Sequence, residues 1–267
     1  MRGRPHRAGP AGEGLTPDSP GTLFAGTSGF SYADWIPRFY PAGTRSGDLL
    51  RTYAARLPAV ELNATFRRRP TAGAIAGWLR ATPPGFRFAV KAQRGSAVRA
   101  LASDPAESIA WLTEPLPSFG ERLGVVLFRV PAEIRRGGPI FDHDPAVSDG
   151  RLRAMLDAWP RDIPLVVELQ DPSWHVDETF AALRAAGATL CATELPEHDE
   201  PPTIRRTGSF LYLRLRREDY TSRDVVAWAA RIRPFLDAGD DVFAFFRHDA
   251  DGRAGELALE LVEAAGG

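Results

Sequence analysis

The strongest constraint on the fold of this chain is a regular alternation of short apolar segments with longer amphipathic ones. The short segments are hydrophobic at consecutive positions, which predicts strands covered on both faces. The longer segments have helical spacing, and only the sixth strand is followed by a Pro-rich loop instead. The expected strands are Thr22–Thr27, Val60–Asn63, Phe86–Lys91, Gly124–Val130, Leu165–Leu169, Thr189–Thr193, Phe210–Leu215 and Val242–Phe246. The expected helices are Asp48–Leu57, Ala72–Arg80, Pro105–Leu116, Ser148–Trp159, Val176–Ala186, Ser222–Ala238 and Arg253–Ala264.

Alternation of this regularity predicts a parallel sheet. Eight strands within residues 21–267 favour a closed, TIM-barrel-like (β/α)8 fold of the α/β class in a single domain. The alternative is an open, doubly wound sheet, but no Gly-x-Gly-x-x-Gly follows the first strand to support a dinucleotide-binding fold. Residues 1–20 are rich in Gly and Pro and have few large apolar side chains, so we predict a disordered tail there.

Charge and cysteine content limit the partners and the cellular compartment that the sequence predicts. Lys plus Arg is 33 and Asp plus Glu is 34, so global charge favours neither nucleic acid nor membrane as a partner. No apolar run has the length of a membrane span, and no secretory signal is evident. The single cysteine, Cys191, excludes a disulfide framework and favours a reducing, cytoplasmic location. Its apolar surroundings indicate a small buried side chain rather than a nucleophile.

Seven short strings occur together in the order and spacing of one known family. They are G-T-S-G-F-S-Y (Gly26–Tyr32), Trp35 with Phe39-Tyr40-Pro41, V-E-L-N-A-T-F (Val60–Phe66), P-G-F-R-F-A-V-K (Pro84–Lys91), Val167-Glu168 with Pro172-Ser173-Trp174, Tyr212-Leu213-Arg214, and Phe246 with Asp249 and Gly252. On these strings the chain resembles the DUF72 family along nearly all of its expected barrel. The resemblance implies a (β/α) barrel and implies no activity, because that family is one of unknown function.

The chain departs from the family pattern at several strand ends, which marks it as a divergent member. Gly95–Ala97 stand in place of the usual Ile-Thr-His after Lys91. The family Tyr, Gln and Arg are replaced by Arg67, Arg129 and Gln170, respectively. The family His-Gly pair is replaced by Arg216-Arg217, and the family Asn by His248. Family chemistry is therefore expected to be altered or lost here.

Candidate catalytic residues lie at the carboxyl ends of the strands, where barrels of this type carry their active sites. Glu61 and Asn63 are two residues apart and share one face of a strand. A buried Glu61 needs a partner, and Lys91, the only lysine, is the natural candidate. Either Glu61 or Glu168 can serve as a general acid or base, with Lys91 tuning its pKa or binding an anion. The alternative is a Glu–Lys–Arg ion network that closes the barrel mouth.

The expected ligand-binding residues surround these candidates. They are Ser28, Tyr32, Trp35, Asn63, Trp174, Arg214 and Asp249. The turn Gly26–Gly29, which holds Ser28, can either cradle a phosphate or be only a turn. The aromatic side chains can stack on a sugar or base, or can pack as a hydrophobic minicore.

No cofactor and no metal site are predicted. The five histidines are scattered without a metal-binding spacing, and His248 with Asp249 near Glu194 is the one weak candidate. A nuclease-like barrel normally requires metal ligands that the sequence does not provide. A pair of strand-end glutamates also occurs in glycoside hydrolases, where their separation sets the stereochemical outcome.

Arginines gather on the predicted site face although the net charge is near zero. They are Arg67–Arg69, Arg129, Arg216, Arg217 and Arg247. They suit an anionic ligand such as a phosphorylated sugar, a nucleotide or, less strongly supported, nucleic acid, unless acidic residues of the same loops neutralise them. We therefore predict a hydrolase or lyase acting on a small anionic ligand; the alternative is a non-catalytic ligand-binding or regulatory barrel. The sequence makes no prediction of oligomeric state.

Overall fold

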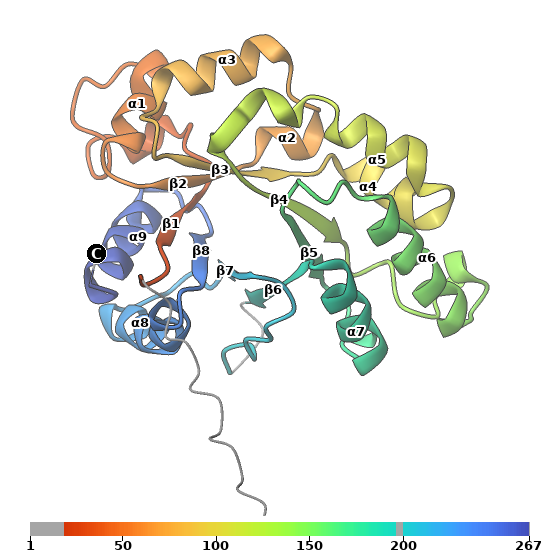
Figure 1. Ribbon diagram of the computed structural model, residues 1–267. Coiled ribbons are helices and arrows are strands. Elements are labelled where there is room, and N and C mark those ends of the chain that lie inside the picture. Colours follow the sequence, from red (N-terminus) through yellow and green to blue (C-terminus); the bar gives the residue numbers. More distant parts are fainter. Residues whose placement is uncertain (1–18, 196–199, 267) are drawn as a thin grey trace, which may run out of the picture.

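Eight parallel strands close into a barrel in the computed structural model, which describes residues 19–195 and 200–266 (Figure 1). Each strand pairs with the next along the chain, and β8 pairs with β1. The strands are β1 (Leu23–Ser28), β2 (Ala59–Leu62), β3 (Arg87–Lys91), β4 (Leu123–Val130), β5 (Leu165–Leu169), β6 (Thr189–Glu194), β7 (Phe210–Leu215) and β8 (Asp241–Phe246). The predicted (β/α)8 barrel is confirmed, and the open sheet is excluded. Most of the predicted tail, residues 1–18, lies outside the described residues.

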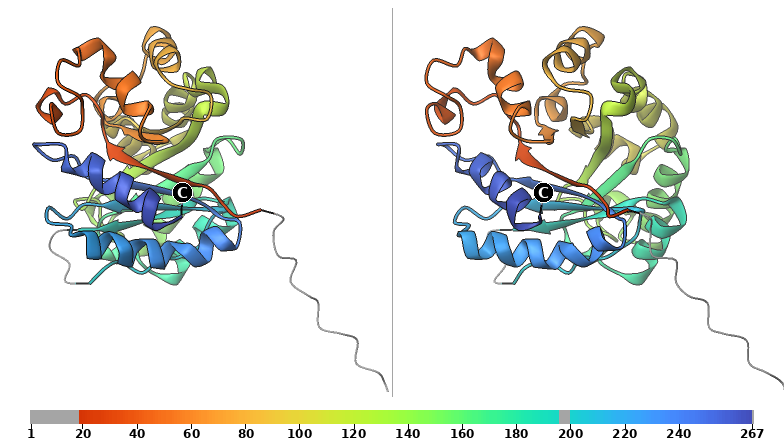
Figure 2. Two further views of the ribbon diagram at one scale, coloured as in Figure 1. Left: turned by 90° about the vertical axis from the view of Figure 1, so that its left-hand side faces the viewer. Right: turned by 60° about the vertical axis from the view of Figure 1, so that its left-hand side comes forward.

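Helices cover the outside of the barrel, with α8 and α9 side by side against β8 and β1 (Figure 2). The α-helices are α1 (Leu49–Ala54), α2 (Ala64–Arg67), α3 (Ala72–Ala81), α4 (Arg94–Ala102), α5 (Pro105–Thr113), α6 (Pro145–Ala158), α7 (Asp177–Ala186), α8 (Ser222–Asp237) and α9 (Arg253–Ala264). Short 3-10 turns are η1 (Ala33–Trp35), η2 (Ser46–Asp48), η3 (Leu116–Arg122), η4 (Pro139–Phe141) and η5 (Pro172–Trp174). Within residues 19–195 and 200–266, no helix combines the length and apolar character that a membrane crossing requires.

Local sequence explains where several helices begin. Asp104 and Asp144 each accept a hydrogen bond from an N–H of the first turn of α5 and α6, and proline follows both. Thr221 and Asp224 form a reciprocal capping box at the start of α8. The sequence did not predict α2 and α4, which are short helices following β2 and β3. Loop rather than helix follows β6 in the described residues, as the prolines predicted.

Alternating residues of each strand point into the barrel and form a core separate from the one under the helices. Its members are Phe24, Ala59, Ala89, Val125, Leu127, Val166, Cys191, Tyr212, Phe243 and Phe245. Cys191 is buried among them, and burial raises the pKa of its thiol well above the ordinary value. The last inward position at the carboxyl end is polar in seven strands, where it places Ser28, Glu61, Lys91, Arg129, Glu168, Thr193 and Arg214. This polar layer closes the hydrophobic interior.

Gly26 permits the close approach of β1 and β2. A Cβ atom at this position would lie 2.0 Å from the carbonyl oxygen of Ala59, which belongs to the backbone and cannot rotate away. We expect Gly26→Ala to lower the free energy of unfolding by about 3 kcal/mol or more, because the strands must separate. Urea unfolding measures the change. Gly77→Ala, in the interior of α3, is the control and should stabilise by about 0.5–1 kcal/mol; equal effects of the two changes would contradict this account.

Candidate functional site

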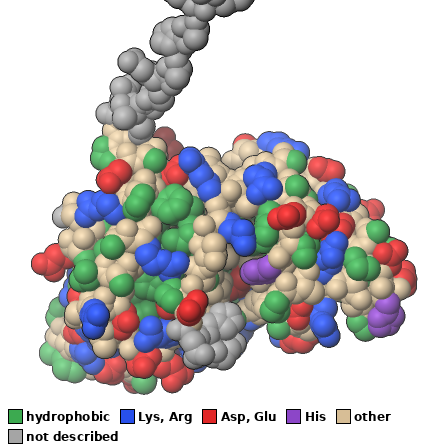
Figure 3. Space-filling model, turned by 90° about the horizontal axis from the view of Figure 1, so that it is seen from below, with side chains coloured by type: hydrophobic (Ala, Val, Ile, Leu, Met, Phe, Trp, Pro, Cys, Tyr) green, Lys and Arg blue, Asp and Glu red, His purple; other side chains and the backbone are tan. Residues whose placement is uncertain are grey.

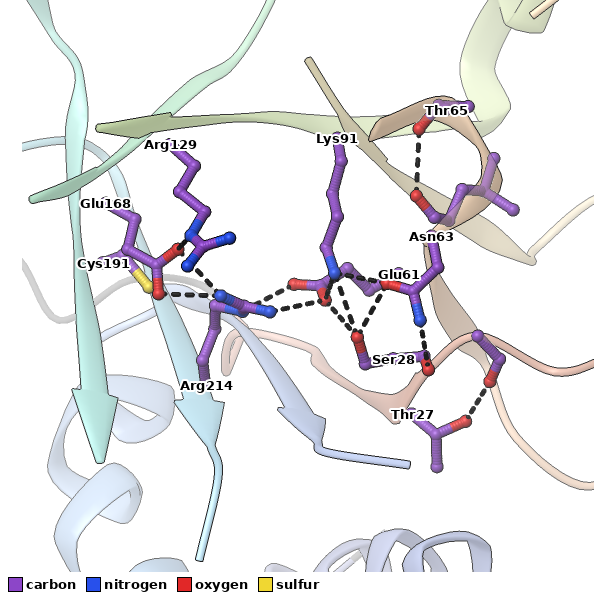
Figure 4. Close-up of polar contacts among 12 residues, drawn as sticks. Thr27, Ser28, Glu61, Asn63, Thr65, Lys91, Arg129, Glu168, Cys191 and Arg214 are labelled. Carbon is purple, nitrogen blue, oxygen red and sulfur yellow. Dashed lines mark hydrogen bonds and ion pairs between the residues drawn. The ribbon is translucent and has the colours of Figure 1, made fainter. Parts of the chain in front are cut away.

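The site is a network of charged and polar side chains that lies across the carboxyl end of the barrel (Figure 4). Glu61 of β2 is its centre and is fully buried. Its Oε1 lies 2.7 Å from Nζ of Lys91 and accepts a 2.6 Å hydrogen bond from the hydroxyl of Ser28. Its Oε2 lies 3.0 Å from Nε of Arg214 and accepts a 2.7 Å hydrogen bond from Tyr212. Lys91 is thus the partner that the sequence predicted for Glu61.

Arg214 of β7 joins the two glutamates. One terminal nitrogen of its guanidinium donates to both carboxylate oxygens of Glu168, at 2.7 Å each. Glu168 also accepts a 2.9 Å hydrogen bond from Thr193 of β6. The network therefore ties β2, β5 and β7 together across the barrel.

Both glutamates are held in the ionised form. Burial by itself would raise the pKa of Glu61, but Arg214 and Lys91 outweigh it and hold the pKa well below its ordinary value. For Glu168, burial is likewise outweighed by Arg214, so the pKa is lowered. A carboxylate that stays ionised across the neutral range has no proton to donate. The geometry therefore favours the ion-network interpretation over a general acid at either position.

Lys91 is held by three acceptors. Its Nζ contacts Glu61, donates to the Ser28 hydroxyl at 3.0 Å and donates to the side-chain oxygen of Asn63. Burial lowers the pKa of Lys91 to about 8, and nearby Arg214 acts in the same direction against the opposing effect of Glu61. The network thus contains one cation whose protonation changes close to neutral pH.

Two further arginines give the barrel mouth more positive than negative charge. Arg129 of β4 has its Nε buried without a hydrogen bond, 3.4 Å from Glu168, and it donates to Gln170 at 2.7 Å. Arg216, just after β7, is half-buried and forms no ion pair with any residue that the structure describes. Burial lowers its pKa, and the nearby Arg214 and Arg129 add to this effect. Four cations, counting Lys91, therefore face two carboxylates.

Asn63, Tyr32 and His248 form the rim beside Lys91. The Asn63 amide donates to the Ser28 carbonyl at 2.7 Å and to the Tyr32 hydroxyl at 3.1 Å. The Tyr32 ring stacks on His248 with centroids 4.9 Å apart. Burial and then the charges of Arg247 and Lys91 lower the pKa of His248, so its imidazole is neutral at pH 7.

His248 and Tyr212 belong to this site but were not among the candidate site residues predicted from the sequence. His248 had been named as a departure from the family asparagine and as part of the weak metal candidate, but not as a ligand-binding or catalytic residue. Tyr212 had been named only in the string that resembles the family, although it is two residues before Arg214 on one strand and therefore shares its face. The alternation of inward-facing residues along β7 is the signal in the sequence that identifies Tyr212.

The structure corrects the expected ligand-binding role of Trp35 and Trp174. Trp35 is fully buried against Phe39, with ring centroids 5.6 Å apart, and its indole donates to the carbonyl of Asp249 at 3.0 Å. Trp174 is also fully buried and donates to the carbonyl of Ile134 at 2.7 Å. Neither ring has a free face for a ligand, because each fills the space between the barrel and its loops. Both side chains therefore pack in a hydrophobic minicore, which was the alternative expected for the aromatic residues.

Asp249 and the turn Gly26–Gly29 are also occupied by structural contacts. The carboxylate of Asp249 accepts hydrogen bonds from the N–H groups of Gly252, at 2.7 Å, and Ala254, so it caps the start of α9. In the turn, the Thr27 N–H donates to the Tyr53 hydroxyl and the Gly29 N–H donates to the Glu61 carbonyl, both at 2.8 Å. With these donors in use, a phosphate cradle at this turn has no support.

The weak metal candidate does not assemble. Glu194 accepts hydrogen bonds from Tyr220 and, at 3.1 Å, from the indole of Trp228. It thereby faces α8 rather than His248 and Asp249. Among residues 19–195 and 200–266, no group of three or more His, Cys, Asp or Glu side chains is arranged to hold a metal ion.

A cavity of about 470 Å³ opens beside the rim, at the carboxyl ends of β7 and β8. Its walls include Arg217, Tyr220, Phe246, Arg247 and His248. His248 belongs to both the rim and the cavity wall. The volume of the cavity falls in the range of small-molecule binding sites.

Comparisons with known proteins agree with the fold. The sequence profile of the family described as "Protein of unknown function DUF72" matches residues 24–267. The chain is 24% identical to UPF0759 protein YunF of Bacillus subtilis, over 90% of this chain and 94% of that protein. It is 25% identical to a DUF72 family protein of Thermotoga maritima of known structure, with a TM-score of 0.75 over 91% of this chain and 98% of that one. A DUF72 family protein of Enterococcus faecalis also gives a TM-score of 0.75, at 17% identity over 91% and 95% of the two chains.

Removing the central charge should destabilise the barrel. We expect Glu61→Gln to lower the free energy of unfolding by about 3–5 kcal/mol, because Lys91 and Arg214 lose a buried counter-charge while the shape is kept. Denaturant unfolding measures this change. The matched control is Glu218→Gln, which breaks an exposed ion pair with Arg247 and should shift stability by no more than about 0.5 kcal/mol. A small effect at Glu61 would show that the network contributes little.

The lowered pKa of Glu168 predicts a specific acid dependence. The ordinary value is 4.5, and the folded state binds this proton only at lower pH, so the stabilisation is complete above pH 4.5 and is lost as pH falls below it. The difference in unfolding free energy between the wild type and Glu168→Gln should therefore shrink from pH 5 to pH 3. Urea titrations at several pH values measure it. A difference that stays constant over this range would contradict an ionised Glu168.

Proposed function

Because this chain belongs to the DUF72 family, whose description names no activity, we propose a function from its site: it binds a small phosphate-bearing ligand at the barrel mouth and acts on it as a hydrolase or lyase. The observation that carries this proposal is the positive surplus around Glu61 and Glu168. A partly buried cation without a full counter-charge is unfavourable, and an anionic ligand supplies that charge. Guanidinium groups also match the geometry of phosphate oxygens.

Arg129 and Arg216 are the groups that bind the phosphate in this proposal. Both lie at the outer edge of the network and are only partly buried, whereas Arg214 beneath them is saturated by two carboxylates. Both also replace other residue types of the family pattern. An anion between them meets two guanidinium groups whose positive charge the network compensates only in part.

Lys91 and His248 are the proton-transfer groups of the proposed reaction. Their pKa values are both lowered, Lys91 to about 8, so near pH 7 the first is mainly an acid and the second a base. An anion bound at the mouth raises the pKa of Lys91 and so favours its protonated, acidic form. The rest of the ligand occupies the 470 Å³ cavity, which shares His248 with the rim. The glutamates then act by positioning the cations.

A non-catalytic binding barrel is the second candidate. It is favoured by the three acceptors around Lys91, which already occupy its three N–H donors. In this case the ligand is bound at the same arginines and leaves unchanged.

Binding can be tested by thermal shift and calorimetry with inorganic phosphate and a panel of phosphorylated sugars. We expect the wild type to be stabilised and the Arg129→Gln/Arg216→Gln variant to bind at least about ten-fold more weakly, because two charge-assisted contacts are lost. Arg51→Gln/Arg153→Gln removes two exposed arginines on α1 and α6 and should leave binding unchanged. No stabilisation of the wild type by any of these anions would overturn the proposal.

The same panel separates catalysis from binding. His248→Asn restores the residue of the family pattern at the rim and is expected to retain phosphate binding while losing turnover. Turnover is measured by product analysis of each compound that binds. Binding without turnover of any compound would leave the non-catalytic barrel as the correct function.

A further inference from the structure

A second basic hollow lies on the same end of the barrel, outside the network. It has a volume of about 610 Å³ and is bordered by the segment after α2 and by α5. Arg67, Arg68 and Arg69 line one side, and Trp111 lines the other. Phe66, the residue before this arginine run, packs 5.5 Å from the guanidinium of Arg129, which places the hollow next to the mouth.

Trp111 is unusual among the six tryptophans of the chain. It is 41% exposed, whereas the other five are buried or half-buried. The guanidinium of Arg69 lies 4.6 Å from its ring centroid and also donates to the Trp111 carbonyl at 2.8 Å. Arg69 pairs in addition with Glu114 at 2.8 Å. The indole is therefore fixed in place by a neutralised arginine while a large part of its surface stays open.

Arg67 and Arg68 differ from Arg69 in having no counter-charge. Both are exposed, and neither side chain forms an ion pair or hydrogen bond within the described part of the chain. The hollow thus combines two free guanidinium groups with an open aromatic surface. An aromatic ring that carries a phosphate complements both features.

We propose that this hollow binds a mononucleotide. The base stacks on Trp111, whose position Arg69 fixes. The phosphate pairs with Arg67 and Arg68. The proposal concerns a site separate from the mouth and does not depend on the function proposed there.

The charges favour a single nucleotide over a nucleic acid strand. Two free cations match one phosphate group, and the carboxylate of Glu114 borders the same hollow. The formal net charge of −1 gives no general attraction for a polyanion. Elsewhere on the molecule, on the face seen from below in Figure 3, basic and acidic side chains are likewise interspersed.

Tryptophan fluorescence of the full chain reports on this site directly. We expect AMP to quench the emission, and we expect adenosine and ribose 5-phosphate each to bind at least about ten-fold more weakly, because each lacks one of the two contacts. Trp111→Leu should abolish the quench and weaken AMP binding in calorimetry by about ten-fold or more. Circular dichroism confirms folding of this surface variant.

Two arginine variants separate the two sites. Arg67→Gln/Arg68→Gln should weaken AMP binding at least about ten-fold, whereas Arg51→Gln/Arg153→Gln should not change it. Arg129→Gln/Arg216→Gln should also leave AMP affinity unchanged; a loss there would place AMP at the mouth and overturn the proposal. Equal affinity for ribose 5-phosphate and AMP would overturn it too, as would about 100-fold tighter binding of a single-stranded oligonucleotide, which would indicate a nucleic acid surface.

Discussion

The contact on which the carboxyl end of this barrel depends is that of Arg214 with Glu61 and Glu168. It joins strands that are far apart in the sequence, and all three side chains are almost completely buried. Charges removed from water remain stable only if each is paired and its hydrogen-bonding capacity is filled. Tyr212 and Thr193 complete the coordination of the two carboxylates. The result is a rigid, ionised layer immediately above the hydrophobic interior.

The properties of the residues around this layer follow from it. Burial in this layer lowers the pKa of Lys91 to about 8, and Arg214, which shares Glu61 with Lys91, acts in the same direction. Because Glu168 is already satisfied by Arg214 and Thr193, Arg129 obtains only a partial counter-charge from it. Arg216 forms no ion pair with any of the described residues. Glu61 and Glu168 balance the charges of Lys91 and Arg214, so the excess of positive charge at the mouth comes from Arg129 and Arg216.

The two parts of the site relate differently to the family pattern. The inner residues Glu61, Asn63, Lys91, Glu168 and Arg214 lie in strings that resemble the family. The residues that change the charge or rim of the mouth, Arg129, Arg216 and His248, lie at departures from it. The carboxyl end of the barrel thus combines inner residues that match the family pattern with outer residues that differ from it.

The sequence by itself determined the barrel, because eight apolar strands separated mainly by helices have few other ways to bury both faces of a sheet. It also determined the pairing of Glu61 with Lys91, since strand alternation and neighbouring strands place them on one face. Only the tertiary structure decided that Trp35 and Trp174 are buried while Trp111 is open, because exposure depends on which loops and helices pack over each ring. Likewise, only the structure showed that Asp249 caps α9 and that Glu168 and Glu61 share one arginine. Pairing of charges across the barrel depends on distances between strands, and those distances are set by closure of the whole sheet.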